Sequence, residues 1–261
     1  MLFVREFCAM VNMNSIALPS GSVLVNIRLW FYSLAWLHLV FTAIVSLSVD
    51  MSEDKDPKVS AYINIRWKLI TCWFNMIALA YFPICIYCDW KERRGMWHIQ
   101  HVASIRQLKD YVMTSILFPT TMFADLMFWR IWHKDLSLIA PLRIFTYLPY
   151  WAQHSLHTVS MLIMLLDLLL VPRRRPNNLK PGICLMMAFM LTYMAMCGIS
   201  FLNGEVVYSV FQIFDSFKLF LLAIMVILEC LFFYLVQWYI VDFVWCPQSY
   251  DGTNGKKLKA Q

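Results

Sequence analysis

Charged residues are scarce in this 261-residue sequence. Asp, Glu, Lys and Arg together make up 15% of it, whereas an ordinary soluble domain contains about 25%. Glycine is also rare, with 7 residues, and the sequence has no glycine-rich phosphate loop and no nucleophile elbow of the α/β-hydrolase kind. These absences exclude a soluble enzyme that binds a nucleotide.

Apolar residues dominate the composition instead. They make up 61% of the chain, and the mean hydropathy is +0.60. A soluble core of this size cannot bury that much apolar surface. The 11 Trp, 12 Tyr and 19 Phe fit a membrane protein as well, because amphipathic rings gather at the lipid headgroups. The composition therefore predicts an integral membrane protein.

Six apolar stretches are long enough to cross a bilayer, which takes about 20 helical residues. They cover residues 29–49, 67–88, 111–131, 148–171, 183–201 and 217–244. The segments between them carry charges or Pro and Asn, which do not stay in hydrocarbon. We predict an all-α, polytopic transmembrane bundle that forms a single domain over residues 1–261, with a short cytosolic tail at 247–261.

Basic residues between the stretches indicate the orientation. With six crossings, fourteen Lys and Arg fall on the side of the termini, Arg5, Lys256, Lys257 and Lys259 among them, and eight fall on the other side. The positive-inside rule then predicts that both termini are cytosolic. We expect the protein in the plasma membrane or the endoplasmic reticulum. The net charge of +6 is explained by topology, and we expect no nucleic-acid partner.

Polar side chains inside the spans are candidate functional groups, because they are costly in hydrocarbon. Thr71 lies four residues beyond Trp67, or about 6 Å into the second span, and His157 lies six residues beyond Trp151, or about 9 Å into the fourth. Both spans enter from the same side. Asp125 falls at nearly the same depth on the third span, so a hydroxyl, an imidazole and a carboxylate share one leaflet.

Thr71 and His157 have the parts of an activated nucleophile, since a hydroxyl needs a neighbouring base to accept its proton. This role would make activity fall at low pH, where imidazole is protonated. The alternative is that each residue forms a structural hydrogen bond between helices. His154 shares a helix face with His157, but the 6 histidines of the chain are too few for a metal cluster, and we expect no metal or other cofactor.

Two further classes of function stay open at this point. In a small transporter or channel, Asp125, His157 and Asp167 would form a proton or ion path. In a membrane regulator without enzymatic activity, both Thr71 and His157 would be expendable. The oligomeric state is not indicated by the sequence.

Three segments, "RWKLITCWFN", "LKDYVMTSILFPTTMFADLMFWRIWHKD" and "LPYWAQHSLHTVSMLIMLLDL", resemble the androgen-induced gene 1 family, and the resemblance extends over most of the chain. It implies a multi-pass threonine hydrolase that cleaves fatty acid esters of hydroxy fatty acids, with a lipid ester in the bilayer as its partner. Matched motif to motif, the family's threonine falls on Thr71 and its histidine on His157. His154 and Asp125 are possible supporting residues. Gln153 departs from the asparagine expected before the first histidine, which puts the substrate range in doubt.

Overall fold

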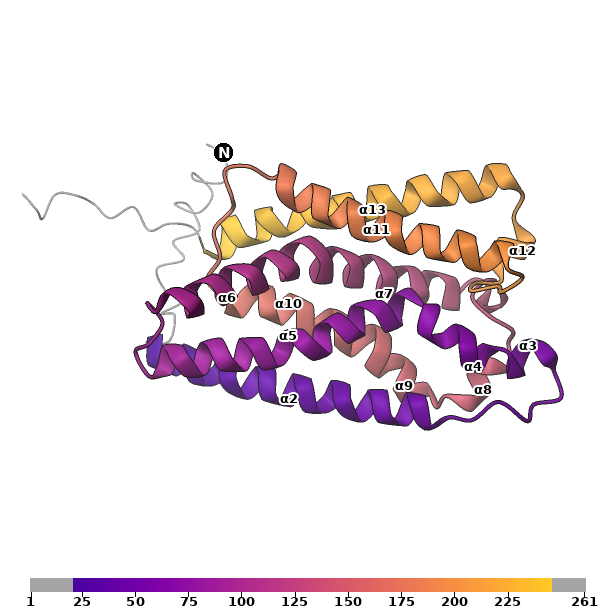
Figure 1. Ribbon diagram of the computed structural model, residues 1–261, viewed down its shortest axis with the longest axis horizontal. Coiled ribbons are helices and arrows are strands. Elements are labelled where there is room, and N and C mark those ends of the chain that lie inside the picture. The colour runs from indigo at the N-terminus through magenta and orange to yellow at the C-terminus, as the bar shows by residue number, and fades with distance from the viewer. Residues whose placement is uncertain (1–20, 246–261) are drawn as a thin grey trace, which may run out of the picture.

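The computed structural model describes residues 21–245, which form helices and no strands (Figure 1). Within this range, 6 helical segments are long and apolar enough to cross a membrane. The predicted six-span all-α bundle is therefore confirmed. The predicted tail at 247–261 and the basic residues Arg5, Lys256, Lys257 and Lys259 lie outside the described residues.

Four spans are single helices, and two are interrupted by a π-helical turn. The single helices are α2 (Gly21–Ser48), α5 (Ile70–Arg93), α11 (Lys180–Leu202) and α13 (Ser216–Val244). The third span consists of α6 (Gln100–Val112), η3 (Met113–Leu117) and α7 (Phe118–Trp132). The fourth consists of α9 (Tyr150–His154), η5 (Ser155–Val159) and α10 (Ser160–Leu170).

Short helices fill the connections at one end of the bundle, where they lie beside one another in Figure 1. They are α3 (Pro57–Ser60), α4 (Tyr62–Ile65), η2 (Arg66–Lys68), η4 (Leu136–Leu138), α8 (Ile144–Tyr147) and α12 (Val210–Ile213). The third span begins at Gln100, eleven residues before the predicted start at 111. Its first turns are polar, and a helix can continue beyond the hydrocarbon where its outer turns meet water.

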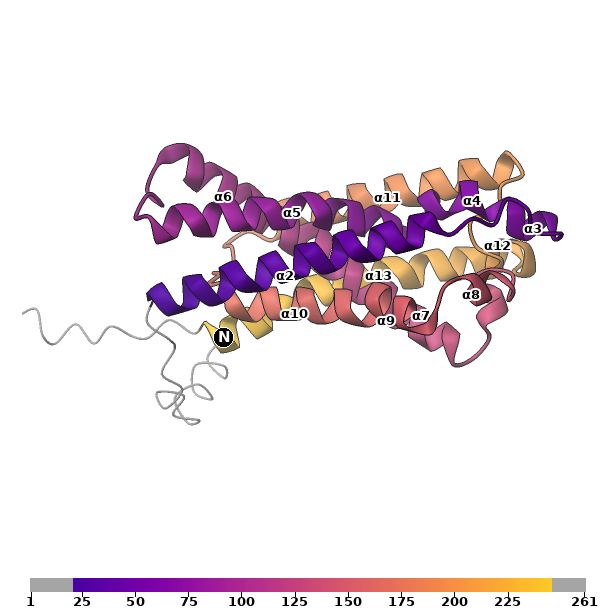
Figure 2. The same ribbon diagram turned by 90° about the horizontal axis from the view of Figure 1, so that it is seen from below.

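The third span lies in the middle of the bundle. Helix α5 packs on one side of it and α11 and α13 pack on the other (Figure 1), while α2 lies against α5 and α10 (Figure 2). Its most apolar stretch is 72% buried, against 17–33% in the other five spans. Pro119 in α7 explains the preceding π-helical turn, because proline has no N–H to continue the regular hydrogen-bond ladder.

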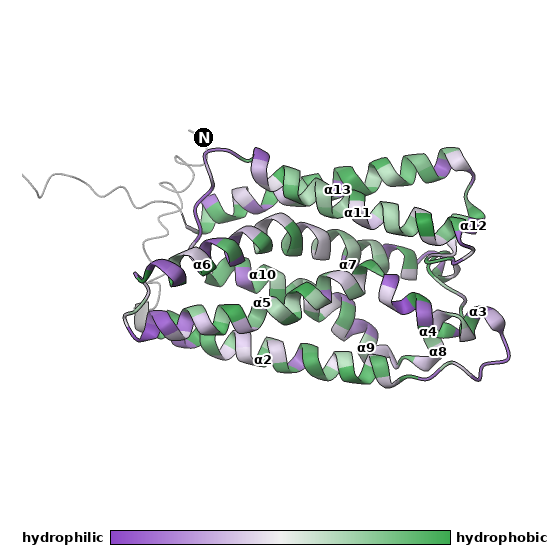
Figure 3. Cartoon of the chain, viewed as in Figure 1, coloured by the Kyte–Doolittle hydropathy of each residue, from purple (hydrophilic) through white to green (hydrophobic). Residues whose placement is uncertain are grey.

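The outer helices present apolar side chains on their exposed faces, and polar residues gather at the two ends (Figure 3). Trp30, Leu34, Leu228 and Phe232 are each more than half exposed. A soluble monomer rarely exposes so much contiguous apolar surface. These faces are suited to contact lipid chains.

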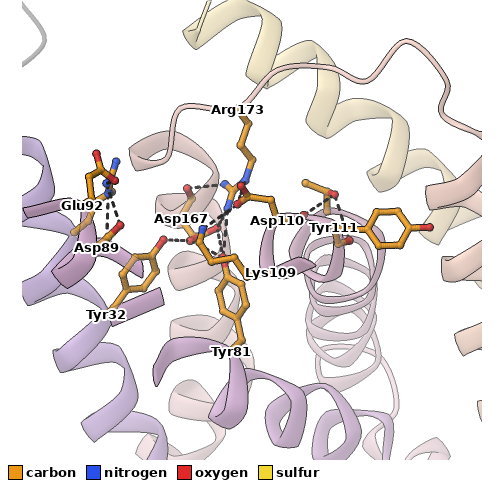
Figure 4. Close-up of polar contacts among 11 residues, drawn as sticks. Tyr32, Tyr81, Asp89, Glu92, Lys109, Asp110, Tyr111, Asp167 and Arg173 are labelled. Atoms are coloured by element: carbon orange, nitrogen blue, oxygen red, sulfur yellow. Dashed lines mark hydrogen bonds and ion pairs between the residues drawn. The ribbon is translucent and has the colours of Figure 1, made fainter. Parts of the chain in front are cut away.

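At one end of the bundle, Asp167 is the centre of a buried polar network (Figure 4). Its carboxylate accepts hydrogen bonds from the hydroxyl groups of Tyr32 and Tyr81 and from Arg173 Nη2, the last at 2.7 Å. Arg173 Nε lies 3.3 Å from Asp110 Oδ1. The network joins helices α2, α5, α6 and α10. Every charge in it has a partner of opposite sign.

A second buried ion pair ties α2 to α5 near the same end. Arg28 donates two hydrogen bonds to the Asp89 carboxylate, at 3.1 and 3.0 Å, and a third to Glu92 at 2.6 Å. A bidentate contact of this kind fixes the geometry of two helices as well as their separation.

We expect Arg173→Gln to lower the free energy of unfolding by about 3–5 kcal/mol, because it leaves the buried Asp167 without its countercharge. Arg175→Gln is the matched control, since Arg175 is 31% exposed and lies 3.6 Å from Asp242; such surface pairs contribute about 0–1 kcal/mol. Denaturant unfolding of both variants in one detergent measures the difference. Equal losses in the two variants would contradict the assigned role of the network.

Candidate active site

A cavity of about 1060 Å³ opens at the opposite end of the bundle from Asp167. Helices α2, α5, α7, α11 and α13 and the turn η5 all contribute to its lining, which is largely apolar. Thr71 and His157, the two residues predicted as nucleophile and base, both line it. The fold thus brings the second and fourth spans to one space, which depth along each helix could not establish.

His157 is held by a carboxylate from the third span. Its Nδ1 lies 3.0 Å from Asp125 Oδ1, and both side chains are buried. The other carboxylate oxygen of Asp125 accepts a hydrogen bond of 2.5 Å from Ser160 Oγ. With Nδ1–H donating to Asp125, Nε2 is the nitrogen free to accept a proton. No described residue forms a hydrogen bond with Nε2.

Two local features fix the orientation of the imidazole. His157 lies in the π-helical turn η5, which places its side chain differently from a regular helical turn, and such turns are frequent at functional sites. The Phe128 ring stacks on the imidazole, with 3.6 Å between ring centroids and 8° between ring planes. The ring is therefore held on its face by Phe128 and on its edge by Asp125.

His154, the other possible supporting histidine, lies outside this site. Its Nδ1 is 3.1 Å from Thr158 Oγ1, and its ring packs against Trp129 and Tyr150, with centroid separations of 4.7 and 4.6 Å. It does not line the cavity. Gln153, where the sequence departs from the expected asparagine, is buried and does line it.

Thr71 is the second residue of α5 and is half-buried. The helix begins here because Leu69 is extended, with a ψ of 141°, and separates η2 from α5. The backbone amide of Thr71 consequently has no hydrogen-bond partner among the described residues. First-turn amides carry the positive end of the helix dipole, so the Thr71 hydroxyl lies next to an unpaired N–H group.

Two tyrosines form a clamp on the extended segment between η2 and α5, just before Thr71. Ile70 N–H donates to Tyr208 Oη at 3.1 Å, and Tyr193 Oη donates to the Lys68 carbonyl at 3.0 Å. The two phenol oxygens are 2.9 Å apart. Because Tyr193 uses its single hydroxyl proton for the Lys68 carbonyl, Tyr208 Oη is the donor between the two phenols, and burial raises the pKa of Tyr208 to about 12.

Sequence patterns could not reveal this clamp. Tyr208 lies in the connection between α11 and α12, where no helical periodicity relates it to Thr71. Tyr193 is one of 12 tyrosines, and nothing in its neighbours along the chain distinguishes it. Phe128 and Ser160 were missed for the same reason, since each is recognisable only through its contact with His157 or Asp125.

Comparison with known proteins agrees with the architecture. The model of the FAR-17a/AIG1-like protein family matches residues 28–240. The chain belongs to this family. No solved structure matches it.

Curated relatives of the family share moderate identity with this chain. The androgen-dependent TFPI-regulating protein of Homo sapiens is 28% identical over 63% of this chain and 70% of its own length. The protein of the same name from Mus musculus is 30% identical over 49% of this chain and 54% of its own. The androgen-induced gene 1 protein of Homo sapiens is 24% identical over 54% of this chain and 62% of its own. The alignments with the last two therefore span less than two thirds of those relatives.

Within residues 21–245, no three His, Cys, Asp or Glu side chains lie close enough together to hold a metal ion. His98 and His101 do not line the cavity, and His101 Nε2 lies 3.1 Å from Tyr87 Oη. Asp167, a member of the ion path considered above, is bonded to Arg173 at the other end of the bundle. Of the predicted site residues, Thr71 and His157 thus line the cavity, and Asp125 contacts it through His157.

We expect Tyr208→Phe to loosen the start of α5, because it leaves the Ile70 N–H without its acceptor at a cost of about 1–3 kcal/mol. Amide hydrogen exchange should accelerate over residues 70–73. Tyr62→Phe is the matched control, since Tyr62 also lines the cavity and is buried, but none of the described residues forms a hydrogen bond with its hydroxyl. Unchanged exchange in Tyr208→Phe would show that the clamp does not hold this turn.

Proposed function

We propose that this protein is an intramembrane threonine hydrolase that cleaves lipid esters, with fatty acid esters of hydroxy fatty acids as its substrate class. The observation that carries the proposal is the arrangement around the cavity: Thr71 and His157 line one space, and Asp125 holds the imidazole in the tautomer that a general base requires. The family resemblance at "WKLIT" and "HSLHT" supports the same two residues.

The reaction begins at the substrate ester carbonyl. Thr71 Oγ1 attacks the carbonyl carbon while His157 Nε2 accepts the hydroxyl proton, and the negative charge of Asp125 stabilises the imidazolium that forms. The unpaired amide of Thr71, at the positive end of α5, stabilises the oxyanion of the tetrahedral intermediate. The three residues, Thr71, His157 and Asp125, come from three different spans.

The second half of the reaction regenerates the threonine. The imidazolium returns its proton to the leaving alkoxide, and the hydroxy fatty acid departs. His157 then accepts a proton from a water molecule that attacks the acyl-enzyme, and it donates this proton to Thr71 Oγ1 as the acyl bond breaks and the free fatty acid is released. Because the site lies near one end of the bundle, water needs to travel only a short distance from the interface.

The cavity is suited to such a substrate in size and character. Its volume of about 1060 Å³ is slightly above the range of about 300–1,000 Å³ that is typical of small-ligand pockets. Its walls include Leu79, Phe123, Met127 and Leu222, which offer apolar contacts to acyl chains. A substrate with two long chains needs this space, and it reaches the site from within the leaflet.

An activity-based probe for serine and threonine hydrolases tests the nucleophile. We expect Thr71→Ala and His157→Ala to reduce the labelling rate of the purified protein at least about 1,000-fold, because removal of a member of such a unit abolishes most of its catalysis. Thr192→Ala is the matched control, since Thr192 is exposed on α11 and donates only to the Ala188 carbonyl. Labelling retained in Thr71→Ala would refute the mechanism and favour the regulator or transporter hypothesis.

Asp125→Asn tests the orientation of the base. We expect a decrease in kcat of about 100-fold to 10,000-fold with little change in KM, because the amide favours the wrong imidazole tautomer while its shape is preserved. Asp167→Asn serves for comparison, as Asp167 lies in the network at the other end and its replacement should affect stability. A larger kcat effect at Asp167 than at Asp125 would contradict the proposed triad.

A further inference from the structure

Charge is distributed unevenly around the cavity. Among the described residues that line it, Arg66 and Lys218 are the ones with permanently charged side chains, and no Asp or Glu is present. Both lie at the end of the bundle where Thr71 is found. An otherwise apolar cavity with cationic groups alone at one end favours a ligand that is apolar along its length and anionic at a single point.

The two cations differ in their partners. Lys218 Nζ lies 3.0 Å from Asp215 Oδ2, so its charge is matched by a carboxylate. Arg66 forms no ion pair within 4.0 Å anywhere in residues 21–245. Its Nη1 donates to the carbonyl groups of Ser46 and Val49 at 3.3 and 3.0 Å, and its Nε is buried without a hydrogen-bond partner.

The contacts of Arg66 position its charge without neutralising it. The carbonyl groups of Ser46 and Val49 belong to the end of α2 and its continuation, and they hold the guanidinium at the cavity wall. The nearby Asp50 carboxylate accepts its hydrogen bond from the Ser52 amide at 2.9 Å. This bond is the main reason why the pKa of Asp50 is lowered, with a smaller contribution from Arg66. Arg66 thus keeps an unpaired Nε, and none of the described carboxylates lies within 4.0 Å of its guanidinium.

A partly buried guanidinium with an unused donor is costly, and an anion in the cavity would remove that cost. Its planar fork matches a carboxylate by two parallel hydrogen bonds, and a carboxylate is the anionic group that the proposed substrate class carries. Arg66 precedes Thr71 by five residues, across the extended Leu69, and both residues line the cavity, so a substrate anchored at Arg66 shares one space with the nucleophile.

We infer that Arg66 is a substrate-binding residue that pairs with a carboxylate of the ester, and that this protein selects esters bearing a free acid over neutral ones. The inference rests on the proposed hydrolase function and adds its specificity determinant. The carboxylate at Arg66 fixes one end of the substrate, and the acyl chains occupy the apolar part of the cavity, which leaves the ester group to meet Thr71.

Turnover of a matched substrate pair tests the inference in the purified full-length protein. The pair is one fatty acid ester of a hydroxy fatty acid as the free acid and the same compound as its methyl ester. We expect the wild type to prefer the acid about 10-fold to 100-fold in kcat/KM, the range of a charge-assisted hydrogen bond. The preference should vanish in Arg66→Gln and persist in part in Arg66→Lys, which keeps the charge. Lys58 is an exposed cation at the same end that does not line the cavity, and Lys58→Gln should retain the preference for the free acid.

Binding to Thr71→Ala separates this inference from the hydrolase proposal, because it requires no turnover. The Thr71→Ala protein should bind the free acid more tightly than the methyl ester, and the difference should disappear when Arg66→Gln is added. Equal affinity for acid and methyl ester, or a preference that survives Arg66→Gln, would overturn the role of Arg66. An Arg66-dependent preference for a long-chain alkyl phosphate over the carboxylate would overturn the assignment of a carboxylate. Probe labelling that is retained in Thr71→Ala, with acid-selective binding intact, would refute the hydrolase proposal alone.

Discussion

The carboxylate of Asp125 is fully buried in the middle of the helix bundle. Such a group has to be hydrogen-bonded within the protein, because no water solvates it there. The bonds to His157 and Ser160 meet this requirement. They also fix the imidazole, leave its second nitrogen free and join the third span to the fourth. The geometry of the site therefore follows from the need to satisfy one buried charge.

The bundle separates its polar groups into two ends with different properties. At one end, Asp167, Arg173 and their partners are matched and closely packed, which makes them suited to hold helices together. At the other end, polar groups lie around a cavity, where the amide of Thr71 and part of the Arg66 guanidinium are unused donors and the imidazole Nε2 is an unused acceptor. Unused donors and acceptors next to an apolar space are what a substrate requires.

Two departures from regular helix lie beside the cavity. Leu69 separates η2 from the second span and places Thr71 in a first helical turn, and η5 interrupts the fourth span at His157. A regular helix pairs every interior amide with its own carbonyl groups and has none left for an oxyanion. In a membrane such interruptions persist where other groups satisfy the backbone, and Tyr193 and Tyr208 do so before Thr71.

The sequence alone determined the number and type of the spans and the depth of each polar residue, because apolar length and the helical rise both run along the chain. It also singled out Thr71 and His157, by depth and by family resemblance. Only the tertiary structure decided which helix faces meet. Rotation about each helix axis and the choice of neighbours come from packing, so the contact of His157 with Asp125, the exclusion of His154 and the clamp from Tyr208, 138 positions after Ile70, have no signature in the order of residues.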